Sequence, residues 1–253
     1  MKKLFYILLV PFLMGSSANK NNETREVISL NGQWDIAESI TTELPFNYNN
    51  TIPVPGLVDM AKQPFDSVGV KCPKRNYYNY HRAFEIPQNL PSVVLLKVYK
   101  ATYGTRVFIN GKEVGYNPYC FTPTLFDIRK FLLPGKTNDI TLQTGAYLDN
   151  IPDSIPNGAD FEKVKYIAGV YDNVEIIFSG YPFIQNVQVV PDIIHKQLRV
   201  VAEIESDKDL LGFSLNYFVQ ENKSGTKSAE GNKCLQNTGD ATGRLLLSCT
   251  FVA

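Results

Sequence analysis

The chain has 253 residues, a formal net charge of zero and 44% hydrophobic residues, enough for one large or two modest domains. Its Lys and Arg residues are spread along the chain, so it lacks the basic footprint of a nucleic-acid-binding surface or of a basic membrane-surface helix. With only two histidines, His81 and His195, and no C-x-x-C spacing, the sequence does not predict a zinc site.

Residues 1–18 are predicted to be a signal peptide. Two lysines precede an apolar run over residues 4–15 that is too short to span a membrane, and the small residues 16–18 suit a signal peptidase. An uncleaved membrane anchor is the alternative, and the lack of a Cys after the run argues against a lipoprotein. We expect a soluble mature protein, exported to the periplasm or the cell exterior, that begins with a polar tail over residues 19–27.

Most of the remaining chain is predicted to be β-strand, because runs of β-branched and aromatic residues alternate with Gly, Pro, Asn and Asp. Such runs occupy residues 92–100, 106–110, 138–145, 173–180, 183–191, 197–205 and 245–253. Asn110-Gly111 predicts a two-residue type I′ hairpin turn, since both central positions of that turn need positive φ. Residues 126–135 are predicted to hold one short helical turn.

Short strands without long helical periodicity predict an all-β protein built from antiparallel sandwiches. A boundary is expected near residues 180–182, so the first sandwich would span residues 28–181. Residues 182–253 would form a second, immunoglobulin-like sandwich. That segment is shorter than the roughly 100 residues of a full immunoglobulin-like domain, so we expect it to be truncated.

The segment 146–168 interrupts the strand pattern. It holds two prolines and several polar residues, and it is longer than a connection between strands needs to be. Loops of this length in a compact domain are usually functional or disordered.

Several motifs have a structural and a functional interpretation. PGKT at 134–137 ends like a phosphate-binding loop, but the glycine that the motif needs is replaced by Lys130, so a turn is favoured. No G-x-S-x-G or G-x-G-x-x-G occurs, which leaves a serine hydrolase or dinucleotide enzyme without support. Trp34 could stack on a sugar, and burial in the core is favoured.

The tyrosine-rich run 76–84 also has a functional and a structural interpretation. Tyr77, Tyr78 and Tyr80 stand beside His81 and Arg82 and could bind a ligand. A strand with alternate side chains buried is the favoured interpretation.

Export would permit disulfides. The four cysteines fall two in each proposed half, so Cys72 with Cys120 and Cys234 with Cys249 is the pairing to test. Small buried thiols are an equally good interpretation in a chain with so few cysteines.

Six motifs in a characteristic order resemble the sugar-binding domain of glycoside hydrolase family 2. The best single match is NGKEVG followed by T-P-x-x-F-D-I. In order, the motifs are SLNGQWDI (29–36), VPG (54–56), YHRAFEIP (80–87), VFINGKEVGYNPYCFTPTLFDI (107–128), PGKTNDITL (134–142) and GVYDNVEII (169–177). The resemblance covers about residues 28–253.

The resemblance implies a galactose-binding-like jelly-roll sandwich, then an immunoglobulin-like sandwich, then a catalytic (β/α)₈ barrel. It implies a β-glycoside as the carbohydrate partner and the barrel of the same polypeptide as the second partner. The sequence departs from the family at Asn79-Tyr80, where Trp-Tyr is common, and at Asp172, where an Arg is common. These departures suggest a divergent branch and leave the substrate open.

No catalytic residue is assigned to this chain. A retaining glycosidase needs two carboxylates about 5–5.5 Å apart, and in the resembled family both are Glu residues of the barrel, the acid/base following an Asn. The only Asn-Glu pair is Asn22-Glu23, in the polar tail. By resemblance to the family's β-galactosidases, Asp160 is the residue that would reach the sugar site when a barrel is attached, with an ordinary loop carboxylate as the alternative. Some members hold a cation near that site; no other cofactor is implied.

Three functional hypotheses follow. The first is a non-catalytic N-terminal portion of an exported, β-galactosidase-like family 2 glycosidase. The second is a free-standing carbohydrate-binding module, which usually shows an exposed aromatic platform. The third is a structural fragment without a ligand, whose unpaired edge strand would invite aggregation.

Overall fold

The computed structural model describes residues 25–158, 162–195, 197–207, 210, 212–220, 223–234 and 244–252. Within these residues the chain is built of antiparallel strands and three short 3₁₀ turns, with no α-helix. The 3₁₀ turns are η1 (Val58–Met60), η2 (Arg129–Phe131) and η3 (Leu148–Asn150). The predicted all-β class is confirmed, and η2 is the helical turn expected within 126–135.

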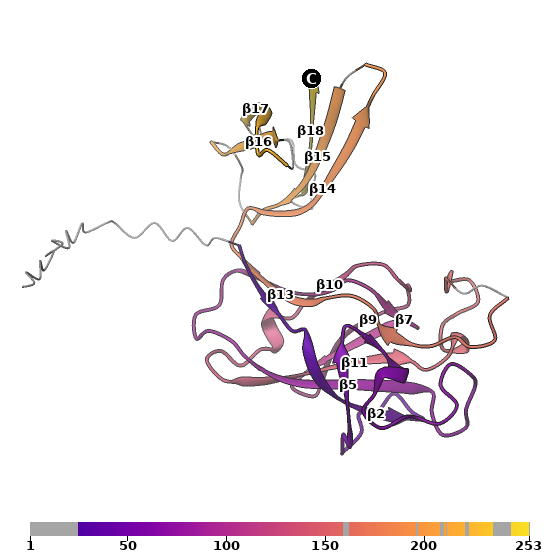
Figure 1. Ribbon diagram of the computed structural model, residues 1–253. Helices are drawn as coiled ribbons and strands as arrows, with labels where there is room; N and C mark the ends of the chain where they lie inside the picture. The colour runs from indigo at the N-terminus through magenta and orange to yellow at the C-terminus, as the bar shows by residue number, and fades with distance from the viewer. Residues whose placement is uncertain are drawn as a thin grey trace, which may run out of the picture.

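Two antiparallel sheets form the first sandwich (Figure 1). The four-stranded sheet has the order β1 (Glu26–Ser29), β13 (Val174–Ser179), β6 (Val93–Val98) and β10 (Thr124–Asp127). The six-stranded sheet has the order β3 (Asn50–Val54), β2 (Gly32–Ser39), β5 (Tyr77–Glu85), β11 (Thr137–Gly145), β8 (Thr105–Ile109) and β9 (Lys112–Asn117). A small third sheet joins β4 (Gly56–Leu57), β12 (Gly169–Val170) and β7 (Ala101–Thr102).

The predicted hairpin joins β8 to β9. Asn110 and Gly111 have φ values of 50° and 74°, as a type I′ turn requires. The Asn110 side chain donates to Asn138 Oδ1 at 2.8 Å and accepts from the Asp139 backbone N–H at 3.0 Å. These bonds tie the turn to β11, so the hairpin is a fixed structural element of the sheet.

The core of this sandwich follows the two-residue period of its strands. In β5, Tyr78 and Tyr80 are fully buried, and Ile140 and Leu142 of the neighbouring strand β11 lie buried beside them. Trp34 is 1% exposed, and its indole N–H donates to the Leu30 carbonyl oxygen at 2.7 Å. The core interpretation of Trp34 is therefore confirmed.

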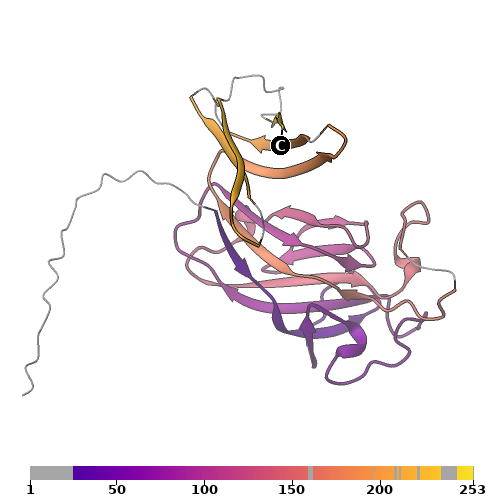
Figure 2. The ribbon, with the colours of Figure 1, turned by 45° about the horizontal axis from the view of Figure 1, so that its top comes forward.

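The strands after β13 form a separate group beside the first sandwich (Figures 1 and 2). One sheet has the order β14 (Phe183–Asp192), β15 (Gln197–Glu205) and β18 (Arg244–Val252), and β16 (Ser214–Gln220) pairs with β17 (Lys227–Cys234). Its described buried cluster is small, with Ala202, Ile204 and Leu210. The described residues thus form a smaller buried core here than in the first sandwich.

A second cluster joins the two groups of strands. Phe183, at the start of β14, is 3% exposed and packs with Val93 and Ile177 of the four-stranded sheet. The Arg25 guanidinium lies 5.5 Å from the centre of the Phe183 ring. The chain therefore changes sheets between β13 and β14, where a domain boundary was expected; the exact domain limits and the truncation of the second domain stay predictions.

Two buried tyrosines make the first sandwich sensitive to alkaline pH. Burial raises the pKa of Tyr78 to about 12 and holds the pKa of Tyr80 well above its ordinary value. Among the described residues neither hydroxyl has a hydrogen-bond partner. Both phenols must stay neutral in the folded state, whereas in the unfolded chain they ionise near pH 10. Their contribution to stability is therefore present below pH 10 and lost as the pH rises toward 12.

We predict that Tyr80→Phe raises the free energy of unfolding by about 1 kcal/mol at pH 7, since it removes a buried unpaired hydroxyl. The variant should also lose less stability than the wild type between pH 10 and 12. Urea unfolding followed by the fluorescence of Trp34 measures both effects, because the chain has one Trp and it lies in this core. Tyr119→Phe, at an exposed tyrosine, is the control; equal pH dependence in both variants would contradict the prediction.

Candidate functional site

The structure describes some of the predicted site residues and leaves others outside the described ranges. Asp160 and the Asn22-Glu23 pair lie outside the described residues, so their roles stay predictions. Cys72 and Cys120 are free thiols in the structure, which is the second of the two interpretations that the sequence left open. Cys72 lies in a tight turn that bridges to Arg75, and Cys120 is 7% exposed in the main core.

The second cysteine pair remains a prediction. Cys234 ends β17 and Cys249 lies in β18, and these strands belong to different sheets. Their side chains lie outside the described part of the chain.

The outer face of the six-stranded sheet is polar, because the strands that bury apolar side chains on one face turn the alternate residues outward. His81 lies there between two carboxylates, with Nδ1 3.7 Å from Asp35 and Nε2 3.3 Å from Asp139. The ring of Tyr48 stacks on His81 with 4.7 Å between the ring centres. The Tyr48 hydroxyl also lies 3.4 Å from Thr141 Oγ1, so the 40–49 loop is held across this face.

A cavity of about 250 Å³ opens at one end of the same sheet. We call it the tyrosine cavity. Its aromatic lining is Tyr77, Tyr103 and Tyr116, its polar lining is Arg106, Gln143 and Asn150, and Gly145 and Pro152 complete the wall. These residues come from β5, β8, β9 and β11 and from two loops, one of which is the segment 146–168 that the sequence marked as unusual.

Charge in the tyrosine cavity is balanced. The Arg106 guanidinium pairs with Glu113 across the β8–β9 hairpin and lies 4.7 Å from the centre of the Tyr116 ring. Burial raises the pKa of both Tyr103 and Tyr116, so their hydroxyls stay protonated at neutral pH. The cavity therefore presents hydrogen-bond donors and acceptors without an uncompensated charge.

The cavity wall is tightly built. Tyr103 and Gly145 exchange backbone hydrogen bonds of 3.4 and 2.9 Å. A Cβ atom at Gly145 would lie 2.5 Å from the Asn150 side chain, and one at Gly104 would lie 2.8 Å from the Tyr116 hydroxyl. Glycine at both positions lets Asn150 and Tyr116 approach the backbone closely.

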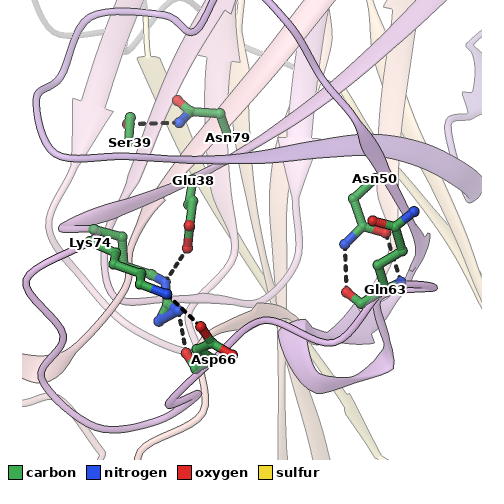
Figure 3. A network of polar contacts seen from close by, with 8 residues as sticks. Glu38, Ser39, Asn50, Gln63, Asp66, Lys74 and Asn79 are labelled. Carbon is green, nitrogen blue, oxygen red and sulfur yellow. Dashed lines mark hydrogen bonds and ion pairs between the residues drawn. The ribbon is translucent and has the colours of Figure 1, made fainter.

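A second cavity, of about 310 Å³, lies between β2, residues 47–50 and residues 63–65. The Asn50 amide in its wall is used by the fold, because it donates to the Gln63 carbonyl oxygen at 2.6 Å and accepts from the Gln63 backbone N–H at 2.9 Å (Figure 3). These two bonds tie the loop at Gln63 to strand β3 at the edge of the sheet, so Asn50 has a structural role here.

Arg75 anchors the loop beside this second cavity. It is 4% exposed, donates from Nε to Glu38 Oε2 at 2.7 Å, and also donates from Nη2 to the Asp66 carbonyl oxygen. Its guanidinium lies 5.3 Å from the centre of the Tyr78 ring. Lys74 pairs with the Asp66 side chain from solvent (Figure 3).

We predict that Arg75→Ala lowers the free energy of unfolding of the first sandwich by about 2 kcal/mol, the scale of hydrogen bonds to a charged group. Lys74→Ala is the matched control, because it contacts the same Asp66 from an exposed position and should leave stability unchanged. Urea unfolding followed by Trp34 fluorescence compares the two. Equal effects of the two substitutions would show that burial of Arg75 contributes nothing.

Among the described residues, no three His, Cys, Asp or Glu side chains are grouped as metal ligands. No helix in the described part of the chain is long and apolar enough to cross a membrane.

Sequence reasoning found only part of the tyrosine cavity. It marked Tyr77 as a ligand candidate within 76–84 and the segment 146–168 as either functional or disordered, and it favoured the strand interpretation for 76–84. That run is strand β5, with Tyr78 and Tyr80 in the core and Tyr77 in the cavity wall. The other lining residues carry no local motif, because they come from separate strands and loops that only the sheet order brings together.

Comparison with known proteins gives structural matches without sequence matches. No protein-family model and no curated protein sequence matches the chain. The fold is similar to a β-D-mannosidase from Dictyoglomus thermophilum, with a TM-score of 0.63 and 15% identity over 89% of this chain. It is also similar to a Bifidobacterium dentium β-glucuronidase complexed with coumarin-3-O-glucuronide, with a TM-score of 0.65 and 17% identity over 92% of this chain. A putative β-galactosidase from Bacteroides fragilis matches with a TM-score of 0.64 and 17% identity over 90% of this chain.

These matches confirm the predicted all-β sandwich fold, which the chain shares with part of each of these glycosidases. The chain spans less than half of each of these proteins, namely 31% of the mannosidase, 43% of the glucuronidase and 35% of the galactosidase.

Proposed function

We propose that this chain is the non-catalytic N-terminal portion of an exported family 2 glycoside hydrolase of the β-galactosidase type. The observation that carries the proposal is the shared fold over about nine-tenths of this chain and less than half of the matching glycosidases. In this proposal residues 28–181 are the jelly-roll domain and residues 182–253 belong to an immunoglobulin-like domain. A (β/α)₈ barrel of the same polypeptide hydrolyses the β-glycoside.

The proposal divides the chemistry between the two parts of the polypeptide. Retaining hydrolysis needs a nucleophile and an acid/base carboxylate at about 5–5.5 Å separation, and we assign both to the barrel. The sandwiches described here would support the barrel and shape the approach to it. Export is proposed from the composition of residues 1–18.

The intact mass of the native product tests this proposal. We expect a mass well above the 28.4 kDa of this chain and hydrolysis of at least one aryl β-galactoside, β-glucuronide or β-mannoside. The recombinant 253-residue chain should hydrolyse none of them. A native product with the mass of residues 19–253, or turnover by this chain alone, would overturn the proposal.

Asp160 offers a residue-level test in the complete native polypeptide. If its carboxylate helps to shape the sugar site, Asp160→Ala should lower kcat/KM by about tenfold or more, equivalent to about 1.4 kcal/mol of transition-state stabilisation. Asp153→Ala, at an exposed carboxylate of the same loop, should leave kcat/KM unchanged. An unchanged kcat/KM in Asp160→Ala would make it an ordinary loop carboxylate.

A further inference from the structure

We propose that two copies of this chain associate through the free edges of strand β14, which pair antiparallel about a two-fold axis at Gln188. The pairing would join the two three-stranded β14–β15–β18 sheets into one continuous sheet. The inference goes beyond the proposed function, because it concerns the second group of strands and involves no glycoside.

Strand β14 lies at the outer side of its sheet (Figure 1). Within the described chain it pairs with β15 alone, from Phe183 opposite Glu205 to Asp192 opposite Gln197. Its other side therefore presents backbone N–H and C=O groups that no described strand pairs with. A row of such groups is a template for pairing with a strand of another chain.

The sequence of β14 lacks the protection that edge strands usually carry. Natural sheets guard an edge by making the strand short or by placing charges or Pro on it. β14 is ten residues long and has no charged residue from Phe183 to Val190. The edge strands of the first sandwich do carry such protection: β1 and β10 have four residues each, with Glu26 and Asp127, β3 has Pro53, and β9 begins with Lys112 and Glu113.

An apolar face of the sheet reaches this free edge. Val187 and Val189 stand opposite Ala202 and Val200 of β15, and residues that stand opposite each other share a face of the sheet. Ala202 is buried, whereas Val187 and Val189 are 51% and 55% exposed. A second strand paired with β14 would continue this face and cover part of the two valines, which is favourable in water.

Two interruptions of β14 select the register of the pairing. A bulge at Gln185 shifts the ladder between Ile184 and Asn186, and Pro191 has no N–H to donate. The uninterrupted segment between them is 186–190, and its centre is Gln188. Antiparallel pairing about that centre puts Gln188 opposite Gln188 and Val187 opposite the partner's Val189. It keeps the apolar face on one side and brings no like charges together.

A second copy is the partner that closes this edge. A two-fold contact uses the same strand on both copies, so it removes both free β14 edges at once. Joining β14 to the β18 edge of the next copy, with the apolar face kept on one side, would give a parallel pair, because both strands run antiparallel to β15. Parallel pairs are slightly less stable, and such a head-to-tail contact would build an open assembly. We therefore expect a closed dimer.

Sedimentation velocity tests the dimer. The protein used is residues 19–253, so that the apolar run 4–15 cannot itself cause association. One strand per copy makes a contact smaller than a standard interface, so we expect a monomer–dimer equilibrium over about 1–100 µM protein. A monomer throughout this range, or a ladder of larger species without a discrete dimer, would overturn the proposal.

Charge variants at the two-fold axis locate the contact. Gln188→Lys sets two ammonium groups opposite each other and should raise the Kd of the dimer about fivefold or more, as should Gln188→Glu alone. An equimolar mixture of the two variants should restore the dimer, because opposite charges then meet. Val164→Lys, at a side chain of the first sandwich that is 83% exposed, is the matched control. Equal weakening by Val164→Lys, or no restoration in the mixture, would contradict pairing at Gln188.

Cross-linking tests the register. Residues directly opposite in an antiparallel pair have Cα atoms about 4.5–5.5 Å apart, within the range of a disulfide. Gln188→Cys should therefore give a covalent dimer on mild oxidation, seen on a non-reducing gel. Asn186→Cys is the control, because its opposite residue is the partner's Val190 and its two copies lie well apart. Equal cross-linking of both variants, or none above the wild type, would overturn the proposal and leave the mass and activity tests of the glycosidase untouched.

Discussion

The pairing of β5 with β11 is the constraint on which the first sandwich depends. These two central strands of the six-stranded sheet contribute Tyr78, Tyr80, Ile140 and Leu142 to one buried layer. Because side chains alternate between the faces of a strand, the residues between them must face outward. The core of the protein and the polar outer face are thus two consequences of one register, and a shift by one residue would exchange them.

Some polar groups near this core have hydrogen-bond partners and others do not. Arg75 and Trp34 are held by backbone carbonyls and neighbouring side chains, whereas the hydroxyls of Tyr78 and Tyr80 have no partner among the described residues. An unpaired buried hydroxyl costs stability that a phenylalanine would not. The tyrosine cavity shows the same pattern, since the Gln143 amide uses its nitrogen in the fold and leaves its oxygen unused. The unpaired phenols of the core make its stability sensitive to alkaline pH.

The fold of this chain and the proposed catalysis lie in different parts of the polypeptide. The structural matches with glycosidases concern architecture, and the chain spans less than half of those proteins. The proposed catalysis accordingly lies in a barrel beyond the described sandwiches. The tyrosine cavity is built only from residues of the first sandwich, with Tyr103, Gly145 and Asn150 in close contact in its wall.

Local sequence determined a large part of this structure. The Asn110-Gly111 turn, the short helical turn at η2, the strand periods and the burial of Trp34 follow from backbone preferences and apolar spacing, which act over a few residues. The order of motifs identified the fold. Tertiary structure alone decided that Tyr77, Arg106 and Gln143 line one cavity, and it leaves Cys72 and Cys120 as free thiols. The physical reason is that hydrogen bonding between distant strands sets which outward-facing side chains become neighbours, and no local pattern records that order.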